Sequence, residues 1–270
     1  MGMAELKRIA LGVEYNGTPF CGWQSQSRGY SVQDALEDAL LRIAGHVPEL
    51  VPAGRTDAGV HAAGQVVHFD TAAVRPLTAW VRGVNSFLPP SVAVLWAQQV
   101  EPAFHARFSA RSRSYRYVLL NRPVRPALSM DRTGWYHGAL DVSLMQRAAG
   151  FLLGEHDFSA FRAAECQARS PERHLWRLDV RRMGERIVFD LSANAFLHHM
   201  VRNIVGTLLW VGQGKRPPEW MQDLLLARDR TLAGPTAAAG GLCLRHVAYE
   251  AGWGLPVAPE LDLSQDGKEG

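Results

Sequence analysis

The sequence predicts a mixed α/β fold in which helices flank open sheets of mixed or antiparallel strands. Three observations favour this class. Segments with alternating apolar residues, which are typical of half-buried strands, recur along the 270 residues. Other segments repeat their apolar residues at helical spacing, and glycine and proline clusters separate the two kinds. Strands interleaved with a few helices are typical of a ferredoxin-like sandwich and not of a barrel.

The first part of the chain supplies several strands and two helices. Residues 8–15 alternate apolar residues with small or polar ones, and Asn16-Gly17 ends this predicted strand. Ser31 followed by Asp34 is typical of a helix start, and apolar residues then recur at helical spacing up to Gly45. The remaining predicted elements are a short strand before Gly54, strands at 65–70 and 92–100, and a helix at 76–88.

The second part repeats this mixture. The predicted strands are 113–119, 242–250 and a hairpin of 174–182 with 186–193. The predicted helices are 141–153, 220–228 and a largely buried helix whose apolar positions run from Leu197 to Leu209. We divide the chain into an N-terminal α/β domain (1–105), a C-terminal α/β domain (106–250) and a tail (251–270). The tail is polar and contains proline, and we expect it to be disordered.

The residue totals are those of a soluble globular protein. Cys21, Cys166 and Cys243 lie far apart, which argues against a disulfide framework and against a cysteine metal cluster. No uninterrupted apolar segment is long enough to span a bilayer. We therefore expect a cytoplasmic protein in a reducing compartment.

The positive charge is concentrated in one stretch. Residues 101–133 hold seven arginines against Glu101 and Asp131 alone. Arginine binds phosphates with a planar fork and stacks on bases, so the cluster predicts an RNA partner. The alternative is a solvated strand face that happens to be rich in arginine. The seven are Arg107, Arg111, Arg113, Arg116, Arg122, Arg125 and Arg132.

The run GRTDAGVHA at residues 54–62 has the composition of a site, because it places Arg55, Asp57 and His61 among glycines with little apolar bulk. In an extended backbone Arg55 and Asp57 project to one side and Thr56 to the other. A neighbouring guanidinium keeps a carboxylate ionised and oriented. The alternative is an ordinary loop with a weak surface ion pair.

This run, followed by QVVHFD at 65–70, resembles the signature of the tRNA pseudouridine synthase I family. Further blocks that resemble the family are FHARFSA at 104–110, GEHDFSAFR at 154–162, NAFLHHMVRNIVG at 194–206 and GGLCL at 240–244. The family usually has an aromatic residue at Cys243, which we interpret as a packing difference. The resemblance implies two similar halves around a central basic cleft, and a homodimer. It also implies that the chain isomerises uridine to pseudouridine at positions 38, 39 and 40 of the tRNA anticodon stem-loop.

The resemblance assigns roles to individual residues. Asp57 becomes the nucleophile that acts on a flipped-out uridine, Tyr115 the tyrosine against the target base, and Arg202 the partner of the Asp57 carboxylate. Without the resemblance, a strand tyrosine such as Tyr115 is usually packing, and Arg202 would reach solvent. Arg55 is placed to fill the vacated space or to hold a phosphate. The other predicted substrate-binding residues are Arg107, Arg111, Arg113, His61 and Leu242.

We expect no cofactor and no metal, because the isomerisation neither oxidises nor adds anything. Gly212-Gln213-Gly214-Lys215 lacks the residues of a phosphate loop. His156 lacks a second ligand at a suitable spacing, and His198 and His199, as neighbours on a helix, would point apart. Two other functions stay open: a non-catalytic RNA-binding or chaperone protein, and a metal-dependent nuclease that uses Asp57, Asp70 and histidines.

Overall fold

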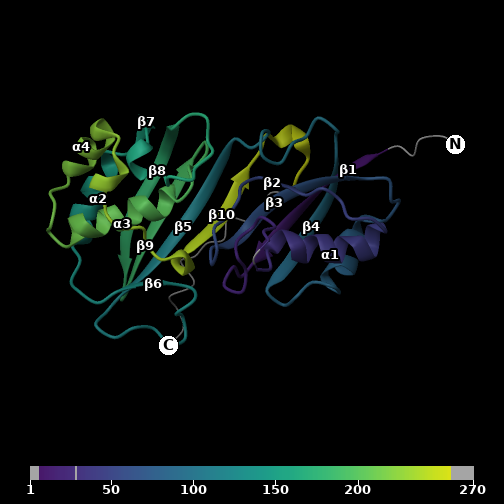
Figure 1. Ribbon diagram of the computed structural model, residues 1–270, viewed down its shortest axis with the longest axis horizontal. Helices are drawn as coiled ribbons and strands as arrows, with labels where there is room; N and C mark the ends of the chain where they lie inside the picture. Colours follow the sequence, from purple (N-terminus) through teal and green to yellow (C-terminus); the bar gives the residue numbers. More distant parts are fainter. Residues whose placement is uncertain (1–5, 28, 257–270) are drawn as a thin grey trace. The chain divides into compact units, whose positions relative to one another are not determined.

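The computed structural model describes residues 6–27 and 29–256. These form two compact units, Met1–Arg111 with Arg245–Gly270 and Ser112–Leu244. Each unit contains strands and helices (Figure 1), so the predicted α/β class is confirmed. The strand β10 (Leu242–Ala248) begins in the second unit and returns the chain to the first.

The first unit is built around β1 (Lys7–Tyr15), which pairs antiparallel with both β3 (His61–Thr71) and β4 (Val92–Val100). The short strand β2 (Val51–Pro52) pairs with β3 on its other side. The apolar positions predicted for β1 are in the core, where Leu11 and Val13 have no exposed surface. The strands predicted in this part of the chain are therefore confirmed, and β3 starts earlier than expected.

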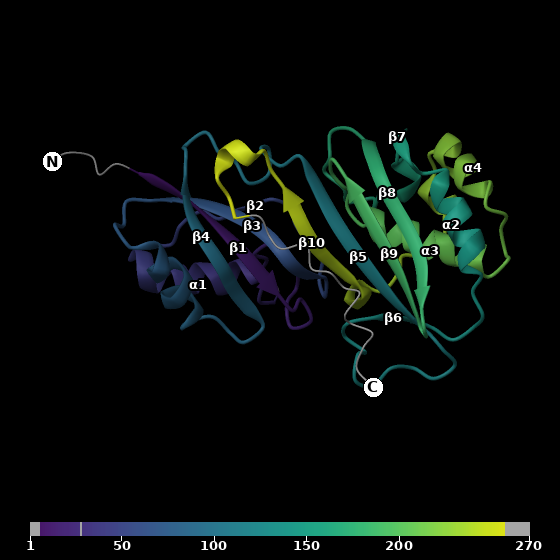
Figure 2. The ribbon, with the colours of Figure 1, turned by 180° about the vertical axis from the view of Figure 1, so that it is seen from behind.

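Helix α1 (Val32–Ala44) lies on one face of these strands (Figures 1 and 2). Its start is the predicted capping box: Ser31 accepts from the Asp34 amide and Asp34 accepts from the Ser31 amide. The second predicted helix is shorter than expected and contains a π turn, η1 (Ala79–Gly83). The wider turn carries Trp80, which is 1% exposed and packs edge-on against Phe69 at 5.4 Å.

In the second unit the strands lie in the order β5, β9, β8, β7. Their bounds are β5 (Ser112–Asn121), β9 (Arg186–Ala193), β8 (Glu172–Met183) and β7 (Gly154–Asp157). Each pairs antiparallel with its neighbour, and the predicted β8–β9 hairpin is confirmed. The short strand β6 (Gly134–Tyr136) runs parallel to β5.

Helices α2 (Val142–Gly150), α3 (Met200–Gly212) and α4 (Trp220–Ala227) lie on one face of the second unit's strands (Figure 2). Short 3-10 turns complete the unit: η2 (Ser159–Phe161), η3 (Arg230–Leu232) and η4 (Ala239–Gly241). As predicted, α3 is almost entirely buried.

The helix predicted from the apolar positions that begin at Leu197 starts later than expected, because α3 begins at Met200. Asn194 closes the end of the hairpin, where its side chain accepts from the His174 amide at 3.0 Å. His199 then adopts a left-handed backbone with φ 61°. This conformation is outside the helical region, so the helix cannot extend past it toward the N-terminus.

The predicted tail begins with a 3-10 turn, η5 (Ala251–Trp253), whose Trp253 packs edge-on against Phe104 at 5.4 Å. Residues 257–270 lie outside the described part of the chain. Across residues 6–27 and 29–256, no helix combines the length and apolar character needed to cross a membrane.

Candidate active site

The loop that carries Asp57 lies between β2 and β3 and is anchored at its start. The Ala53 amide donates to the carbonyl oxygen of Val66 at 2.8 Å. The Gln65 side-chain amide, which has no exposed surface, donates to the carbonyl oxygen of Gly54 at 2.7 Å. Both partners belong to β3, so the sheet itself fixes the position at which the loop leaves it.

Thr56 fixes the middle of the loop from inside the protein. Its side chain is 7% exposed, and its hydroxyl shares a 2.8 Å hydrogen bond with the hydroxyl of Tyr15. Its carbonyl oxygen accepts from the Trp23 amide at 3.0 Å. Arg55 is exposed and Asp57 is half-buried. The burial of Thr56 agrees with the predicted alternation, whereas the projection of Arg55 and Asp57 to one side stays a prediction.

Glycines outside the loop allow the close approach that holds it. A Cβ atom on Gly17 would lie 2.0 Å from the carbonyl oxygen of Val60. One on Gly22, which has φ 112°, would lie 2.9 Å from that of Thr56. Within the loop Gly59 has φ 76°, as a tight turn requires, whereas a Cβ on Gly54 would meet nothing within 4 Å.

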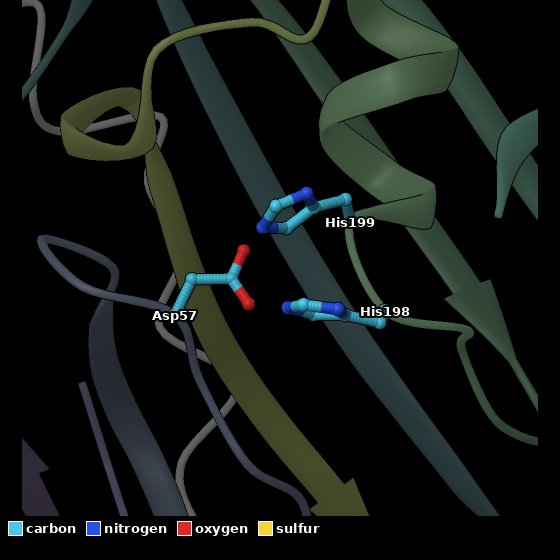
Figure 3. Close-up of side chains that lie close together, drawn as sticks. All are labelled: Asp57, His198 and His199. Carbon is cyan, nitrogen blue, oxygen red and sulfur yellow. The ribbon is translucent and has the colours of Figure 1, made fainter. Parts of the chain in front are cut away.

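The backbone on both sides of Asp57 is thus held in place. Thr56 precedes it, and the Asp57 carbonyl oxygen accepts from the Val60 amide at 3.1 Å. Figure 3 shows the carboxylate projecting from this loop. A carboxylate on a rigid loop is presented in one orientation, which is the arrangement that a nucleophile requires.

His61 supports the loop from its far end. It is 5% exposed, and its Nδ1 accepts from the Gly17 amide at 3.0 Å. This bond ties the start of β3 to the segment that follows β1. The predicted contact between His61 and substrate stays a prediction.

Tyr115 lies on β5 opposite Leu191 and is half-buried. Its ring packs edge-on against Phe196 with the centroids 5.0 Å apart. Tyr117, two residues along the same strand face, is 1% exposed, and burial raises its pKa well above the usual range. Tyr117 therefore belongs to the core, whereas Tyr115 keeps part of its ring accessible.

Arg202 lies in the first turn of α3, where the segment after η3 holds it. Its Nε donates to the carbonyl oxygen of Ala237 at 2.8 Å, and the Ala237 amide donates back to the Arg202 carbonyl at 3.1 Å. The guanidinium is therefore oriented by a fixed backbone atom. Asp57 belongs to the first unit and Arg202 to the second, and their pairing stays a prediction.

The expectation that His198 and His199 point apart is wrong. Both precede α3 (Figure 3), and their ring centroids are 4.0 Å apart. The left-handed backbone at His199 turns its side chain toward that of its neighbour, which a helix would not do. His156 lies in β7, and its Nε2 is 2.8 Å from the carbonyl oxygen of Leu153.

Several predicted phosphate-binding arginines have partners inside their own unit. Arg113 is 8% exposed and donates to the carbonyl oxygen of Asn194 at 2.9 Å. Arg111 forms an ion pair with Glu250. The guanidinium of Arg107 lies 5.6 Å from the ring centre of Phe108.

Two further arginines of the second unit share one carboxylate. Arg116 and Arg181 both bind Asp190, each with a closest distance of 2.6 Å. Burial would raise the pKa of Asp190, but the hydrogen bonds and charges of these arginines outweigh it and hold that pKa below its usual range.

Leu242, which is predicted to bind substrate, is only 5% exposed. Its contact with substrate stays a prediction.

Sequence reasoning missed the residues that hold the site. Tyr15 and Trp23 contact the Asp57 loop from 33 or more positions away, and no local pattern indicates such contacts. Phe196 packs on Tyr115 from 81 positions away. A local signal exists for Gln65, because it is a polar residue directly before the apolar pair Val66-Val67 of β3.

The sequence is similar over most of its length to proteins of one family. A family model described as tRNA pseudouridine synthase matches residues 12–109 and 148–250. A Thiobacillus denitrificans protein named tRNA pseudouridine synthase A is 58% identical over 255 residues, which cover 94% of this chain and 98% of that protein. Proteins of the same name from Dechloromonas aromatica and Chromobacterium violaceum are 60% and 61% identical, and each alignment covers 92% of this chain and 95% of the relative. The chain therefore belongs to the tRNA pseudouridine synthase family.

Proposed function

We propose that this chain isomerises uridine to pseudouridine at positions 38, 39 and 40 of the tRNA anticodon stem-loop. The observation that carries the proposal is the Asp57 carboxylate, presented by a loop whose backbone is anchored from β3, Tyr15 and Trp23. The high identity to proteins named as synthases supports catalysis and disfavours the non-catalytic RNA-binding alternative.

The reaction breaks the bond between the sugar and a base nitrogen, turns the base, and rejoins it through carbon. An ionised carboxylate can act as the nucleophile on the base or on the ribose, as carboxylates do in other covalent glycosyl chemistry. Asp57 takes this role. A proton must then leave the newly bonded carbon, and Tyr115 or Asp57 accepts it. Arg202, held by Ala237, pairs with the carboxylate and keeps it ionised.

The target uridine must leave the stem to react. Extruding a paired base costs a few kcal/mol, which contacts to the phosphates offset. Arg55, exposed beside Asp57, fills the vacated space or holds a phosphate. Tyr115 keeps part of its ring accessible and packs against the extruded base.

The enzyme works as a homodimer in the cytoplasm, without metal or cofactor. A second copy would let a chain of this size span a tRNA arm. The chemistry supports the absence of a cofactor, because the product has the same atoms and the same oxidation state as the substrate.

The test is pseudouridine mapping on an unmodified tRNA transcript incubated with purified protein in chelator. Asp57→Asn removes the nucleophile, so we expect no product while tRNA binding persists. Asp70→Asn is the matched control, because Asp70 lies on β3 in an ion pair with Arg8 and its change should leave product formation intact.

Each alternative function gives a different outcome. A nuclease would shorten the RNA, lose its activity in chelator and depend on Asp70. For a non-catalytic RNA-binding protein, Asp57→Asn would change neither RNA binding nor any other measured activity. Absence of pseudouridine from the anticodon stem-loop with wild-type protein would overturn the proposal.

A further inference from the structure

The loop between β4 and β5 holds an aromatic side chain in solvent. Phe108 is 75% exposed, although the chain buries most of its large apolar residues. Leaving a phenylalanine in water instead of burying it costs about 1.5–3 kcal/mol, and Phe108 is the most exposed aromatic side chain of the described residues.

The inner side of this loop is packed into the first unit. Phe104 has no exposed surface and contacts the rings of Tyr249 and Trp253, with centroids at 5.2 and 5.4 Å. The Ala106 amide donates to Nδ1 of His68 at 3.1 Å, and its carbonyl oxygen accepts from the Tyr249 hydroxyl at 2.6 Å. The base of the loop is therefore fixed to β3 and to the segment after β10.

The tip of the loop is closed by its own hydrogen bonds. The Ser109 amide donates to the carbonyl oxygen of His105 at 2.8 Å, and the His105 amide donates to the Ser109 hydroxyl at 3.0 Å. Nδ1 of His105 accepts from the amides of Arg107 and Phe108, both at 3.2 Å. Because the backbone is held at each of these positions, the direction in which Phe108 leaves the loop is set before any partner binds.

The surroundings of Phe108 are aromatic and basic. The His105 ring lies 4.3 Å from it, and the Arg107 guanidinium lies 5.6 Å from its ring centre. Burial and the charge of Arg8 lower the pKa of His105, which favours its neutral form. The exposed Phe108 ring can stack on a nucleobase while the Arg107 cation binds the phosphate of the same strand. An acidic partner would leave the ring without a contact, and a purely apolar partner would leave the cation without one.

We propose that Phe108 stacks on an unpaired nucleobase of the tRNA, with Arg107 at the adjacent phosphate. The inference rests on the proposed function only for the identity of the RNA. The fixed loop reduces the conformational entropy lost on binding, because the ring is already placed.

The test measures the dissociation constant for an unmodified tRNA transcript by fluorescence anisotropy, with every variant in the Asp57→Asn background to prevent turnover. Phe108→Ala should weaken binding by roughly 5- to 100-fold, the range for loss of one base stack. Phe108→Trp keeps a stacking surface and should bind like the parent. Phe87→Ala is the matched control, because Phe87 is 55% exposed in the same unit, and we expect no change.

A second measurement separates stacking from charge. Loss of a stack should leave the slope of log Kd against log salt unchanged, because no phosphate contact disappears. Equal binding by Phe108→Ala and the parent would overturn the inference. So would a change in molar mass by light scattering in Phe108→Ala, because the ring would then contact a second copy of the chain.

The inference and the proposed function fail in different experiments. If wild-type protein forms pseudouridine and Phe108→Ala binds tRNA normally, only the stacking inference is wrong. If Phe108→Ala binds weakly but wild-type protein forms no pseudouridine, only the proposed function is wrong.

Discussion

Two hydrogen bonds of Thr56, one through its hydroxyl and one through its carbonyl oxygen, hold the backbone directly before Asp57. Thr56 bonds Tyr15 and accepts from Trp23, so the middle of the loop cannot rotate without breaking both contacts. A buried donor or acceptor left without its partner costs about 1–3 kcal/mol, so alternative loop conformations are disfavoured. The reactive side chain is therefore oriented through the residue before it.

His68 makes the free energy of unfolding depend on pH, and it also holds the loop that carries Phe108. It is 4% exposed, and burial together with the charge of Arg8 lowers its pKa from 6.5 to about 4. Its Nδ1 accepts from Ala106, so protonation would place a hydrogen where an acceptor is needed. As the pH falls, the unfolded chain is protonated at His68 before the folded protein is. The contribution of His68 to the free energy of unfolding is therefore complete above its unfolded pKa of about 6.5. It decreases by up to roughly 3 kcal/mol as the pH falls to the folded pKa of about 4.

Urea unfolding at several pH values between 4 and 8 measures this effect. We expect the free energy of unfolding of the wild type to fall as the pH drops below about 6.5. His68→Asn keeps an acceptor near Nδ1 without titrating, so its free energy of unfolding should depend less on pH in this range. Parallel pH dependences in the two proteins would contradict the assignment to His68.

At single positions, sequence reasoning succeeded where alternation or composition carries the information. The burial of Thr56 between the exposed Arg55 and the half-buried Asp57 follows from the alternation of an extended backbone. The burial of Arg113 could not be predicted, because its partner is a backbone oxygen 81 positions away at Asn194. Patterns of residue types indicate which face a side chain occupies, but they do not identify its distant partner.

At the scale of elements, local signals predicted what local physics determines. The capping box at Ser31 and the period-two hairpin strands are complete within a few residues, and both are confirmed. The start of α3 depends instead on the left-handed backbone of His199, which no local residue pattern indicates. The apolar period continues through residues 197–201, so periodicity alone extended the helix too far.

Gly206 allows the segment around Pro235 to approach α3 closely. A Cβ on Gly206 would lie 1.7 Å from the carbonyl oxygen of Pro235, in the segment whose Ala237 holds Arg202. Gly206→Ala must therefore push this segment away, and we expect a loss of about 1–3 kcal/mol of stability. Pseudouridine formation should fall as well, because Arg202 loses its fixed partner.

The matched control is Gly150→Ala at the end of α2, where a Cβ would meet nothing within 4 Å. That change should be neutral or stabilise by up to about 1 kcal/mol, because alanine restricts the unfolded chain. Thermal unfolding and pseudouridine mapping of both variants test the contact. If both variants unfold at the same temperature, the approach of Pro235 to α3 does not constrain the fold.

At the scale of the whole molecule, charge is divided unevenly between the two units. Residues 112–244 hold 18 Lys and Arg against 12 Asp and Glu, whereas the rest of the chain holds 11 against 14. The total of +3 hides this division. The sequence also does not indicate that the chain returns to the first unit at Arg245. Contacts between residues after 245 and residues before 111 leave no local pattern in the sequence.

This distribution predicts a strong dependence of tRNA binding on salt, because each arginine that contacts a phosphate displaces a counterion. We expect log Kd to rise linearly with log salt between 50 and 200 mM, with a slope of about 0.7–0.9 for each phosphate contact.

Two arginine variants test which side chains contribute to this slope. Arg125 is exposed, so Arg125→Gln should reduce the slope by about 1 if Arg125 contacts a phosphate. Arg111→Gln should reduce it less, because Glu250 already offsets that charge. Affinity that does not change with salt would contradict the interpretation of the arginines, whereas equal slopes for the two variants would show that Glu250 leaves Arg111 fully available to RNA.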